Sequence, residues 1–210
     1  MIIRRVVVGM WRANCYIVGS ENTLQGLIID PGDEPEDILA EVKKTGLDIK
    51  LLVATHGHID HIGAIGILKR SLGAEVAIHE DDASALQGDG RFFWGRHFGP
   101  PMRADRLLKH GDTIDIADLR FQVINTPGHT YGGICLYGHG VLFTGDTLFR
   151  HSIGSSGIGT GTRAELLDSI TRRLMVLPDE TIVYPGHGSP TTIGEERKNN
   201  RYLHMDYEYY

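Results

Sequence analysis

The chain has 210 residues, a formal net charge of -6 at pH 7, 41% hydrophobic residues and 23% charged residues. This length and composition are typical of one ordinary globular domain, and we expect residues 1–210 to form a single domain. The acidic balance argues against nucleic acid as a partner, and no stretch approaches the roughly 18 apolar residues of a membrane-spanning helix.

Strand-like segments rich in Val, Ile and Leu alternate with amphipathic helical segments along the chain. The expected strands are 2–8, 14–18, 26–30, 50–54, 75–78, 113–116, 119–125, 134–137, 141–144 and 181–184. The expected helices are 34–45, 62–72, 80–86, 163–177 and 193–199. This order, without a break in composition, predicts a layered α/β protein in which sheets pack together and helices lie outside.

The start of the chain and its two cysteines indicate the compartment. The apolar run at the N-terminus is short and is broken by Gly9 and Arg12, which is typical of a strand rather than a signal peptide. Cys15 and Cys135 lie in apolar, strand-like surroundings, where we expect buried, reduced thiols rather than a disulfide. Together these features predict a cytoplasmic protein.

Segment 88–103 is the least regular part of the sequence. It carries Phe92, Trp94 and Phe98 among Gly and Pro, an aromatic content that is unusual for a linker. Two interpretations stay open: these rings line the entrance for a substrate, or they form a small core of their own beneath the loop.

The most informative segment is His56-Gly57-His58-Ile59-Asp60-His61, directly after an expected strand. It places three imidazoles and one carboxylate within six residues. Imidazole is the commonest protein ligand for metals, and a nearby carboxylate suits a hard or borderline divalent ion. The alternative is a solvated polar turn before a helix, so the metal interpretation depends on whether the chain supplies further ligands.

Three more candidate ligands each follow an expected strand, in turns that contain Gly or Pro. They are His129 in Thr-Pro-Gly-His-Thr, Asp146 in Phe-Thr-Gly-Asp-Thr and His187 in Tyr-Pro-Gly-His-Gly. Loops at strand ends of a rigid sheet can hold ligands in a fixed geometry. The seven candidates are His56, His58, Asp60, His61, His129, Asp146 and His187. Because one ion takes roughly three or four protein ligands, this number suits two ions.

The segments 55–61, 126–130, 144–147 and 185–188 resemble the motifs of the metallo-β-lactamase superfamily, and the resemblance covers nearly the whole chain. Within that superfamily the chain is similar to glyoxalase II-like hydrolases, especially small stand-alone bacterial members, over 186–195. Full-length glyoxalase II enzymes carry a C-terminal helical extension that grips glutathione, which we expect this chain to lack. The resemblance implies a four-layer αβ/βα sandwich with the site at one edge, between the two sheets.

Carried over position by position, the resemblance implies two metal sites that share one carboxylate. The ligands of the first ion would be His56, His58 and His129. The ligands of the second ion would be Asp60, His61 and His187. Asp146 would bridge the two ions. Asp60 and Asp146 would be the catalytic carboxylates, because they would hold the metal ions whose bridging hydroxide is the nucleophile. Asp30, in a strand-end Asp-Pro-Gly, would orient a ligand imidazole. The implied cofactors are two divalent ions, zinc first, with iron or manganese also compatible with these ligands.

The leading hypothesis for function is a thioester hydrolase of the hydroxyacylglutathione hydrolase type, acting on a small molecule such as S-lactoylglutathione. A thiolate leaves without prior protonation, which suits a site with no spare acid. Two alternatives stay open: a mononuclear iron persulfide dioxygenase with His56, His129 and Asp146 as ligands, or a lactonase or phosphodiesterase on the same fold. The segment 154–160 lacks the Gly-Arg pair and acidic residue usual in similar proteins, so the substrate is left open. The sequence does not indicate an oligomeric state.

Overall fold

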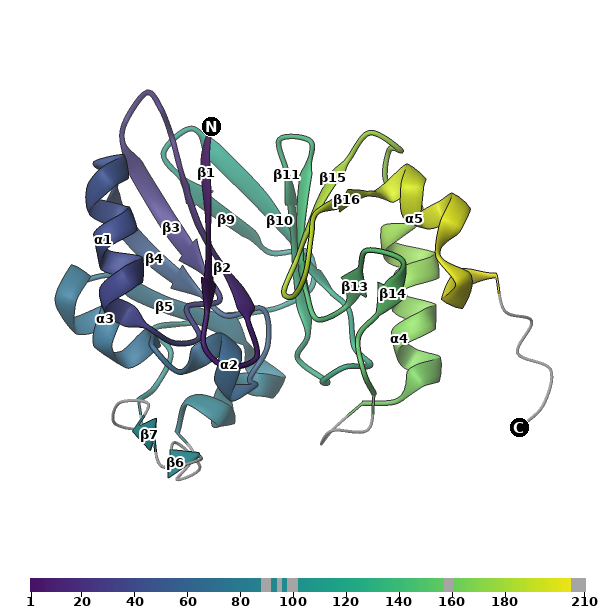
Figure 1. Ribbon diagram of the computed structural model, residues 1–210, viewed down its shortest axis with the longest axis horizontal. Helices are drawn as coiled ribbons and strands as arrows, with labels where there is room; N and C mark the ends of the chain where they lie inside the picture. Colours follow the sequence, from purple (N-terminus) through teal and green to yellow (C-terminus); the bar gives the residue numbers. More distant parts are fainter. Residues whose placement is uncertain (88–91, 94–95, 98–101, 157–160, 205–210) are drawn as a thin grey trace.

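The computed structural model describes residues 1–87, 92–93, 96–97, 102–156 and 161–204. Two β-sheets face each other, with helices α1 and α3 on the outer side of one sheet and α4 and α5 on the outer side of the other (Figure 1). The layers are therefore helix, sheet, sheet, helix, which confirms the expected αβ/βα sandwich.

The first sheet is mixed, with the strand order β1-β2-β3-β4-β5-β8. Its strands are β1 (Ile2–Val8), β2 (Ala13–Gly19), β3 (Gln25–Ile29), β4 (Asp48–Val53), β5 (Glu75–His79) and β8 (Arg106–Leu108). Strands β1 to β3 are antiparallel, and β3, β4, β5 and β8 run parallel to one another. The parallel strands need crossover connections, of which two are α1 (Pro35–Thr45) and α3 (Ile65–Leu72).

The second sheet has the strand order β16-β15-β12-β11-β10-β9. Its strands are β9 (Thr113–Ile116), β10 (Leu119–Asn125), β11 (Ile134–Gly138), β12 (Val141–Gly145), β15 (Ile182–Pro185) and β16 (Thr191–Thr192). Strands β9 to β12 form an antiparallel meander, and β15 runs parallel to β12. Its helices are α4 (Arg163–Ser169), the π-helical turn η3 (Ile170–Leu174), α5 (Ile193–Asn199) and the 3-10 turn η4 (Arg201–Leu203). Two short hairpins join β6 (Phe92–Phe93) to β7 (Arg96–His97) and β13 (Leu148–Phe149) to β14 (Ser152–Ile153).

Alternation of side chains along the strands produces three hydrophobic cores. In β2, Ile17 packs in the core beneath α1 and α3, whereas Tyr16 packs between the two sheets. In β12, Phe143 packs between the sheets, whereas Leu142 packs in the core beneath α4 and α5. Because both faces of these strands are buried, their sequences read as continuous apolar runs.

The structure corrects several expected element boundaries. The helix expected over 62–72 is two helices, and α2 (Ile59–Ile62) begins inside the histidine cluster. The break arises because the amide of Ala64 donates to the carbonyl of Pro31 at 3.0 Å instead of continuing the helical ladder. The helix expected over 163–177 ends earlier, and the strands β8 and β16 were not predicted because each has only two or three residues.

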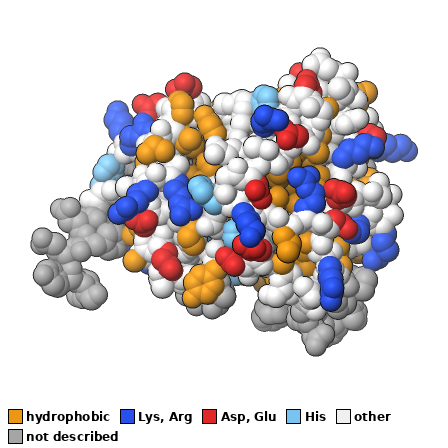
Figure 2. Space-filling model, turned by 180° about the vertical axis from the view of Figure 1, so that it is seen from behind, with side chains coloured by type: hydrophobic (Ala, Val, Ile, Leu, Met, Phe, Trp, Pro, Cys, Tyr) orange, Lys and Arg blue, Asp and Glu red, His pale blue; other side chains and the backbone are white. Residues whose placement is uncertain are grey.

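Both cysteines are buried and free, as expected. Burial raises the pKa of the Cys15 thiol well above its usual value and that of Cys135 to about 11, which keeps both thiols protonated and unreactive. Among the residues that the structure describes, no helix has both the length and the apolar character needed to cross a membrane. On the face drawn in Figure 2, Lys and Arg side chains are scattered among Asp and Glu.

The aromatic cluster between the sheets generates a prediction about stability. Phe143 is fully buried, and its ring centroid lies 5.3 Å from those of Tyr16 and Tyr184. Phe143→Ala should leave a cavity and lower the free energy of unfolding by about 3–5 kcal/mol, measured by urea denaturation. As a control, Val176→Ala shortens the side chain of a residue that is 71% exposed. It should change the free energy of unfolding by less than about 0.5 kcal/mol. Similar losses in the two variants would contradict this account of the core.

Candidate metal centre

The predicted site residues lie at one edge of the sandwich. Asp30 follows β3, segment 56–61 follows β4, and His129, Asp146 and His187 follow β10, β12 and β15. Strands β3 and β4 are parallel, and β10, β12 and β15 run in one common direction, so the carboxyl ends within each sheet share an edge. The structure brings all seven predicted ligands and Asp30 together there.

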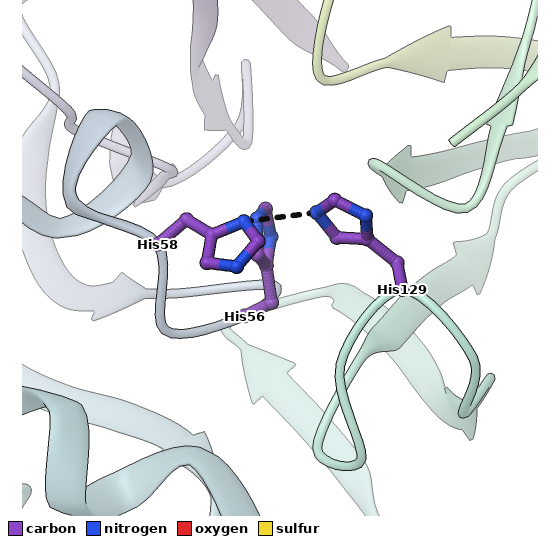
Figure 3. Close-up of side chains that lie close together, drawn as sticks. All are labelled: His56, His58 and His129. Carbon is purple, nitrogen blue, oxygen red and sulfur yellow. Dashed lines mark hydrogen bonds between the residues drawn. The ribbon is translucent and has the colours of Figure 1, made fainter. Parts of the chain in front are cut away.

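His56, His58 and His129 form the first group of ligands. Their nearest ring nitrogens all lie within 4.8 Å of one another. The three rings point toward a common space, with His129 reaching across from the loop after β10 (Figure 3). His58 Nδ1 lies 2.9 Å from His129 Nε2, so two nitrogens that can both act as ligands face each other.

Asp60, His61 and His187 form the second group, with ligand atoms again within 4.8 Å. Asp60 and His61 lie on α2, whereas His187 comes from the loop after β15. The Asp146 carboxylate lies between the two groups. Its oxygens are 3.4 Å from His61 Nε2, 3.5 Å from His187 Nε2 and 3.6 Å from His129 Nε2. Asp146 can therefore contact an ion in either group.

The Asp30 carboxylate sets the orientation of two imidazoles. It accepts from the Thr55 amide at 2.7 Å, from the Thr55 hydroxyl at 2.7 Å and from His61 Nδ1 at 2.9 Å. The Thr55 hydroxyl uses its proton to donate to Asp30. Toward His56 Nδ1, which lies 3.1 Å away, it can therefore act only as an acceptor, so His56 Nδ1 carries the proton. The proton on Nδ1 leaves a lone pair on Nε2, which is the nitrogen that a metal would bind in His56 and His61.

Backbone carbonyls orient two further imidazoles in the same way. His129 Nδ1 donates to the Ser155 carbonyl at 2.6 Å, and His187 Nδ1 donates to the Trp11 carbonyl at 3.1 Å. Both rings therefore present Nε2 to the site. In four imidazoles, those of His56, His61, His129 and His187, Nδ1 donates to an outer partner and Nε2 faces the site. Such a set of inward-facing lone pairs is expected of a metal centre.

Two buried atoms of the site lack a hydrogen bond within the described part of the chain, namely His56 Nε2 and Asp146 Oδ1, and Asp146 Oδ1 has an ion-pair contact with His61 Nε2 at 3.4 Å. A buried polar atom without a partner costs free energy and calls for an explanation. Both atoms lie where the two ligand groups converge, and both are lone-pair donors. A divalent cation would satisfy them, so the residues present fit the metal ions that the resemblance implies.

The charges of the site also favour a bound cation. Burial, followed by the neighbouring imidazoles, lowers the pKa of His56 and keeps it neutral. Burial alone would lower the pKa of His61, but the Asp146 and Asp30 carboxylates outweigh it and raise that pKa to about 9. In His187, Asp146 and Asp60 overcome burial in the same way and raise the pKa to about 10. The carboxylates thus attract cations to this centre.

Asp82, which the sequence did not single out, fastens the two halves of the first group. Its side chain is mostly buried, with the residue 8% exposed, and it accepts from the amide of Gly57 at 2.8 Å and from that of Gly132 at 2.9 Å. One carboxylate thus joins the loop of His58 to the loop of His129. In the sequence Asp82 is one of three successive acidic residues, and no local pattern distinguishes it from its neighbours.

Asn14 is a second residue that the sequence did not reveal. Its side-chain amide donates to the carbonyls of Pro185 at 2.8 Å and Gly188 at 2.9 Å, on either side of His187. The Tyr16 hydroxyl donates to the same Pro185 carbonyl at 2.7 Å. The β1–β2 hairpin therefore holds the loop of His187, although the two are far apart in the chain.

The aromatic segment 88–103 is not tested. Trp94 and Phe98 lie outside the described residues, and the side chain of Phe92 is not described. Both interpretations of this segment remain predictions.

A family model for the metallo-beta-lactamase superfamily matches residues 8–187. The chain belongs to this superfamily. This membership confirms the predicted superfamily, whose members bind metal ions. The hydroxyacylglutathione hydrolase GloC of Haemophilus influenzae is 34% identical over 211 residues, covering 97% of this chain and 98% of that protein. This relative supports the predicted similarity to glyoxalase II-like members.

Solved structures of this superfamily share the fold over nearly the full chain. BLEG-1, a B3 metallo-beta-lactamase, superposes with a TM-score of 0.90 at 32% identity, covering 96% of this chain and 99% of that one. TTHA1623, solved in a di-iron-bound form, has a TM-score of 0.85 at 35% identity, and the match covers 95% of this chain and 100% of that one. The second of these neighbours holds two metal ions.

The role of Asp82 generates a prediction about metal affinity. In Asp82→Asn only one side-chain oxygen remains to accept from two amides, so one ligand loop loses its anchor. We expect the affinity for at least one ion to fall by about 10–100-fold, measured by competition with a chromophoric chelator. Asp81→Asn changes the exposed neighbour and should leave the affinity unaltered. Unchanged affinity in Asp82→Asn would show that the loops are held without this carboxylate.

Proposed function

We propose that this protein is a thioester hydrolase of the hydroxyacylglutathione hydrolase type with a centre for two metal ions. The observation that carries the proposal is the position of the Asp146 carboxylate between two complete groups of ligands. The GloC relative supports the reaction type, and the di-iron form of TTHA1623 supports two ions.

Each group of ligands would hold one ion in this proposal. The first ion would be bound by His56, His58 and His129. The second ion would be bound by Asp60, His61 and His187. Asp146 would contact both ions, and Asp30 would orient the ring of His61 by accepting from its Nδ1. When bound, the ions supply Lewis-acid polarisation of a carbonyl and a hydroxide nucleophile at neutral pH. Zinc is the first choice, and iron and manganese also suit these nitrogen and oxygen ligands.

The residues around the centre explain why a thioester suits it. A cleft of about 360 Å³ opens onto the ligands, and its described lining residues are Trp11, His58, Ile59, Asp60, His129, Asp146 and Ser155. Every titratable side chain among them is a proposed metal ligand. None is therefore left to protonate a leaving group, as an amine or alkoxide would require. A thiolate departs without that proton, so cleavage of a thioester needs no further residue.

The alternative with a single iron assigns the metal to His56, His129 and Asp146. It leaves Asp60, His61 and His187 as a converging group of donors without a function, although their hydrogen bonds direct them to the same space. The geometry therefore favours two ions over one.

The proposal predicts that metal-loaded protein hydrolyses S-lactoylglutathione. Release of glutathione is followed with a thiol reagent, and the two buried cysteines of the native protein should contribute little to that signal. Protein treated with a chelator serves as the control and should regain activity when zinc, iron or manganese is restored. Absence of hydrolysis of this and of simpler thioesters, with activity on a lactone or phosphodiester instead, would contradict the proposal.

Two substitutions separate the shared ligand from an unshared one. Asp146→Ala should lose both ions and all hydrolysis, because among the described residues Asp146 is the one carboxylate that faces both groups. His187→Ala should lose only the second ion and retain about one ion per chain. Metal content after desalting is measured by mass spectrometry, and circular dichroism checks that each variant is folded. Equal loss of both ions in the two variants would contradict the assignment.

A further inference from the structure

A second pocket, of about 310 Å³, lies beside the metal centre. One wall is formed by the β1–β2 hairpin, including Arg5, Trp11 and Arg12, and the other by the loop after β15, including His187 and Ser189. Neither arginine takes part in the metal site or in the proposed bond cleavage.

Trp11 connects this pocket to the metal cleft, because it lines both. Its side chain lies at the surface, with the residue 41% exposed, while its carbonyl accepts from His187 Nδ1. His187 also lines the pocket, yet it directs Nε2 toward Asp60 and Asp146 at 3.4 and 3.5 Å. A molecule with its reacting carbonyl in the cleft can therefore extend past Trp11 into the pocket.

The two guanidinium groups at this pocket have no acidic partner among the residues that the structure describes. Arg5 Nη1 donates to the Gly188 carbonyl at 3.0 Å, which is uncharged. Neither Arg5 nor Arg12 forms an ion pair with a described acidic residue, and the Arg12 side chain has no hydrogen bond to the described part of the chain. Other exposed arginines do form such pairs, as Arg172 does with Asp168 at 2.6 Å. In a chain of net charge -6, two positive charges without an acidic partner in its described part mark a place for an anion.

The backbone holds Arg12 in place for such a role. Arg12 has a φ of 56°, in the left-handed region that non-glycine residues rarely adopt. Its amide closes the hairpin turn by donating to the Gly9 carbonyl at 3.1 Å. Glu34, an acidic residue near this turn, accepts from the Gly9 amide at 3.3 Å and does not line the pocket.

We propose that this pocket binds an anionic group, a carboxylate or a phosphate, on the thiol portion of the thioester that the metal centre cleaves. The inference rests on the proposed function and adds the substrate class. A guanidinium presents a planar fork of N–H donors that matches both anions, and Arg5 and Arg12 would approach the group together. The pocket would thereby hold the leaving thiol while the acyl group lies at the ligands.

The test compares three thioesters with the same lactoyl group on metal-loaded protein. S-lactoylglutathione carries carboxylates, S-lactoyl-coenzyme A carries phosphates, and the lactoyl thioester of N-acetylcysteamine is uncharged. We expect kcat/KM of the wild type to be at least tenfold higher for one anionic thioester than for the uncharged one. The preferred anionic thioester identifies the group that the pocket takes.

The substitution Arg12→Gln keeps a polar side chain of similar reach and removes the charge. We expect it to lower the ratio of kcat/KM for the preferred anionic thioester to that for the uncharged thioester by about tenfold, mainly through KM. Arg5→Gln should lower the ratio in the same direction while an amide remains to donate to Gly188. Arg4→Gln is the matched control, because Arg4 lies 3.9 Å from Glu41, away from the pocket, and should leave the ratio unaltered.

A ratio that is the same in Arg12→Gln, Arg4→Gln and the wild type would overturn the inference while leaving the thioesterase proposal intact. If metal-loaded wild type cleaves none of the three thioesters, the proposed function fails, and calorimetry tests the pocket separately. Binding of glutathione or coenzyme A that weakens about tenfold in Arg12→Gln but not in Arg4→Gln then supports the anion pocket. Absence of binding, or equal affinity in both variants, overturns it.

Discussion

The hydrogen bonds on the outer nitrogens of the imidazoles determine which atoms the candidate metal centre presents. Asp30 accepts a hydrogen bond from His61 Nδ1 and another from the Thr55 hydroxyl, which in turn accepts from His56 Nδ1. Both imidazoles therefore direct Nε2 inward. The same Thr55 also connects the two sheets, since its carbonyl accepts from the Ile134 amide at 2.9 Å. Assembly of the sandwich and orientation of the ligands therefore depend on one buried network, and a change at Asp30 would affect both.

The second half of the site depends on contacts between segments far apart in the chain. His187 is placed by the Trp11 carbonyl and by Asn14, which grips the carbonyls on either side of it. Asp82 performs the corresponding task between the loops of His58 and His129. None of these three anchoring residues is a proposed ligand, yet each fixes the backbone that carries one. The metal centre is thus a property of the assembled sheets rather than of the histidine cluster alone.

Much of the fold and of the site could be predicted because both follow from local patterns. Continuous apolar runs identified the central strands, and a His or Asp just past a strand end identified the candidate ligands that the structure brings together. What could not be predicted is set by tertiary hydrogen bonds. The break between α2 and α3 depends on Pro31 accepting from Ala64, and the roles of Asp82 and Asn14 depend on partners between 25 and 174 positions away. Strands as short as β16 owe their existence to pairing with β15 rather than to their own sequence.

We propose that five imidazoles and two carboxylates, those of Asp60 and Asp146, define two adjacent metal sites. Anomalous diffraction from crystals of the metal-loaded protein, recorded on both sides of the absorption edge of the metal, tests it most directly. The account predicts two peaks, one bordered by His56 Nε2, His58 Nδ1 and His129 Nε2, and the other by Asp60 and the Nε2 atoms of His61 and His187, with Asp146 touching both. A single peak at full occupancy, or a metal bound through Nδ1 of His61, would contradict it.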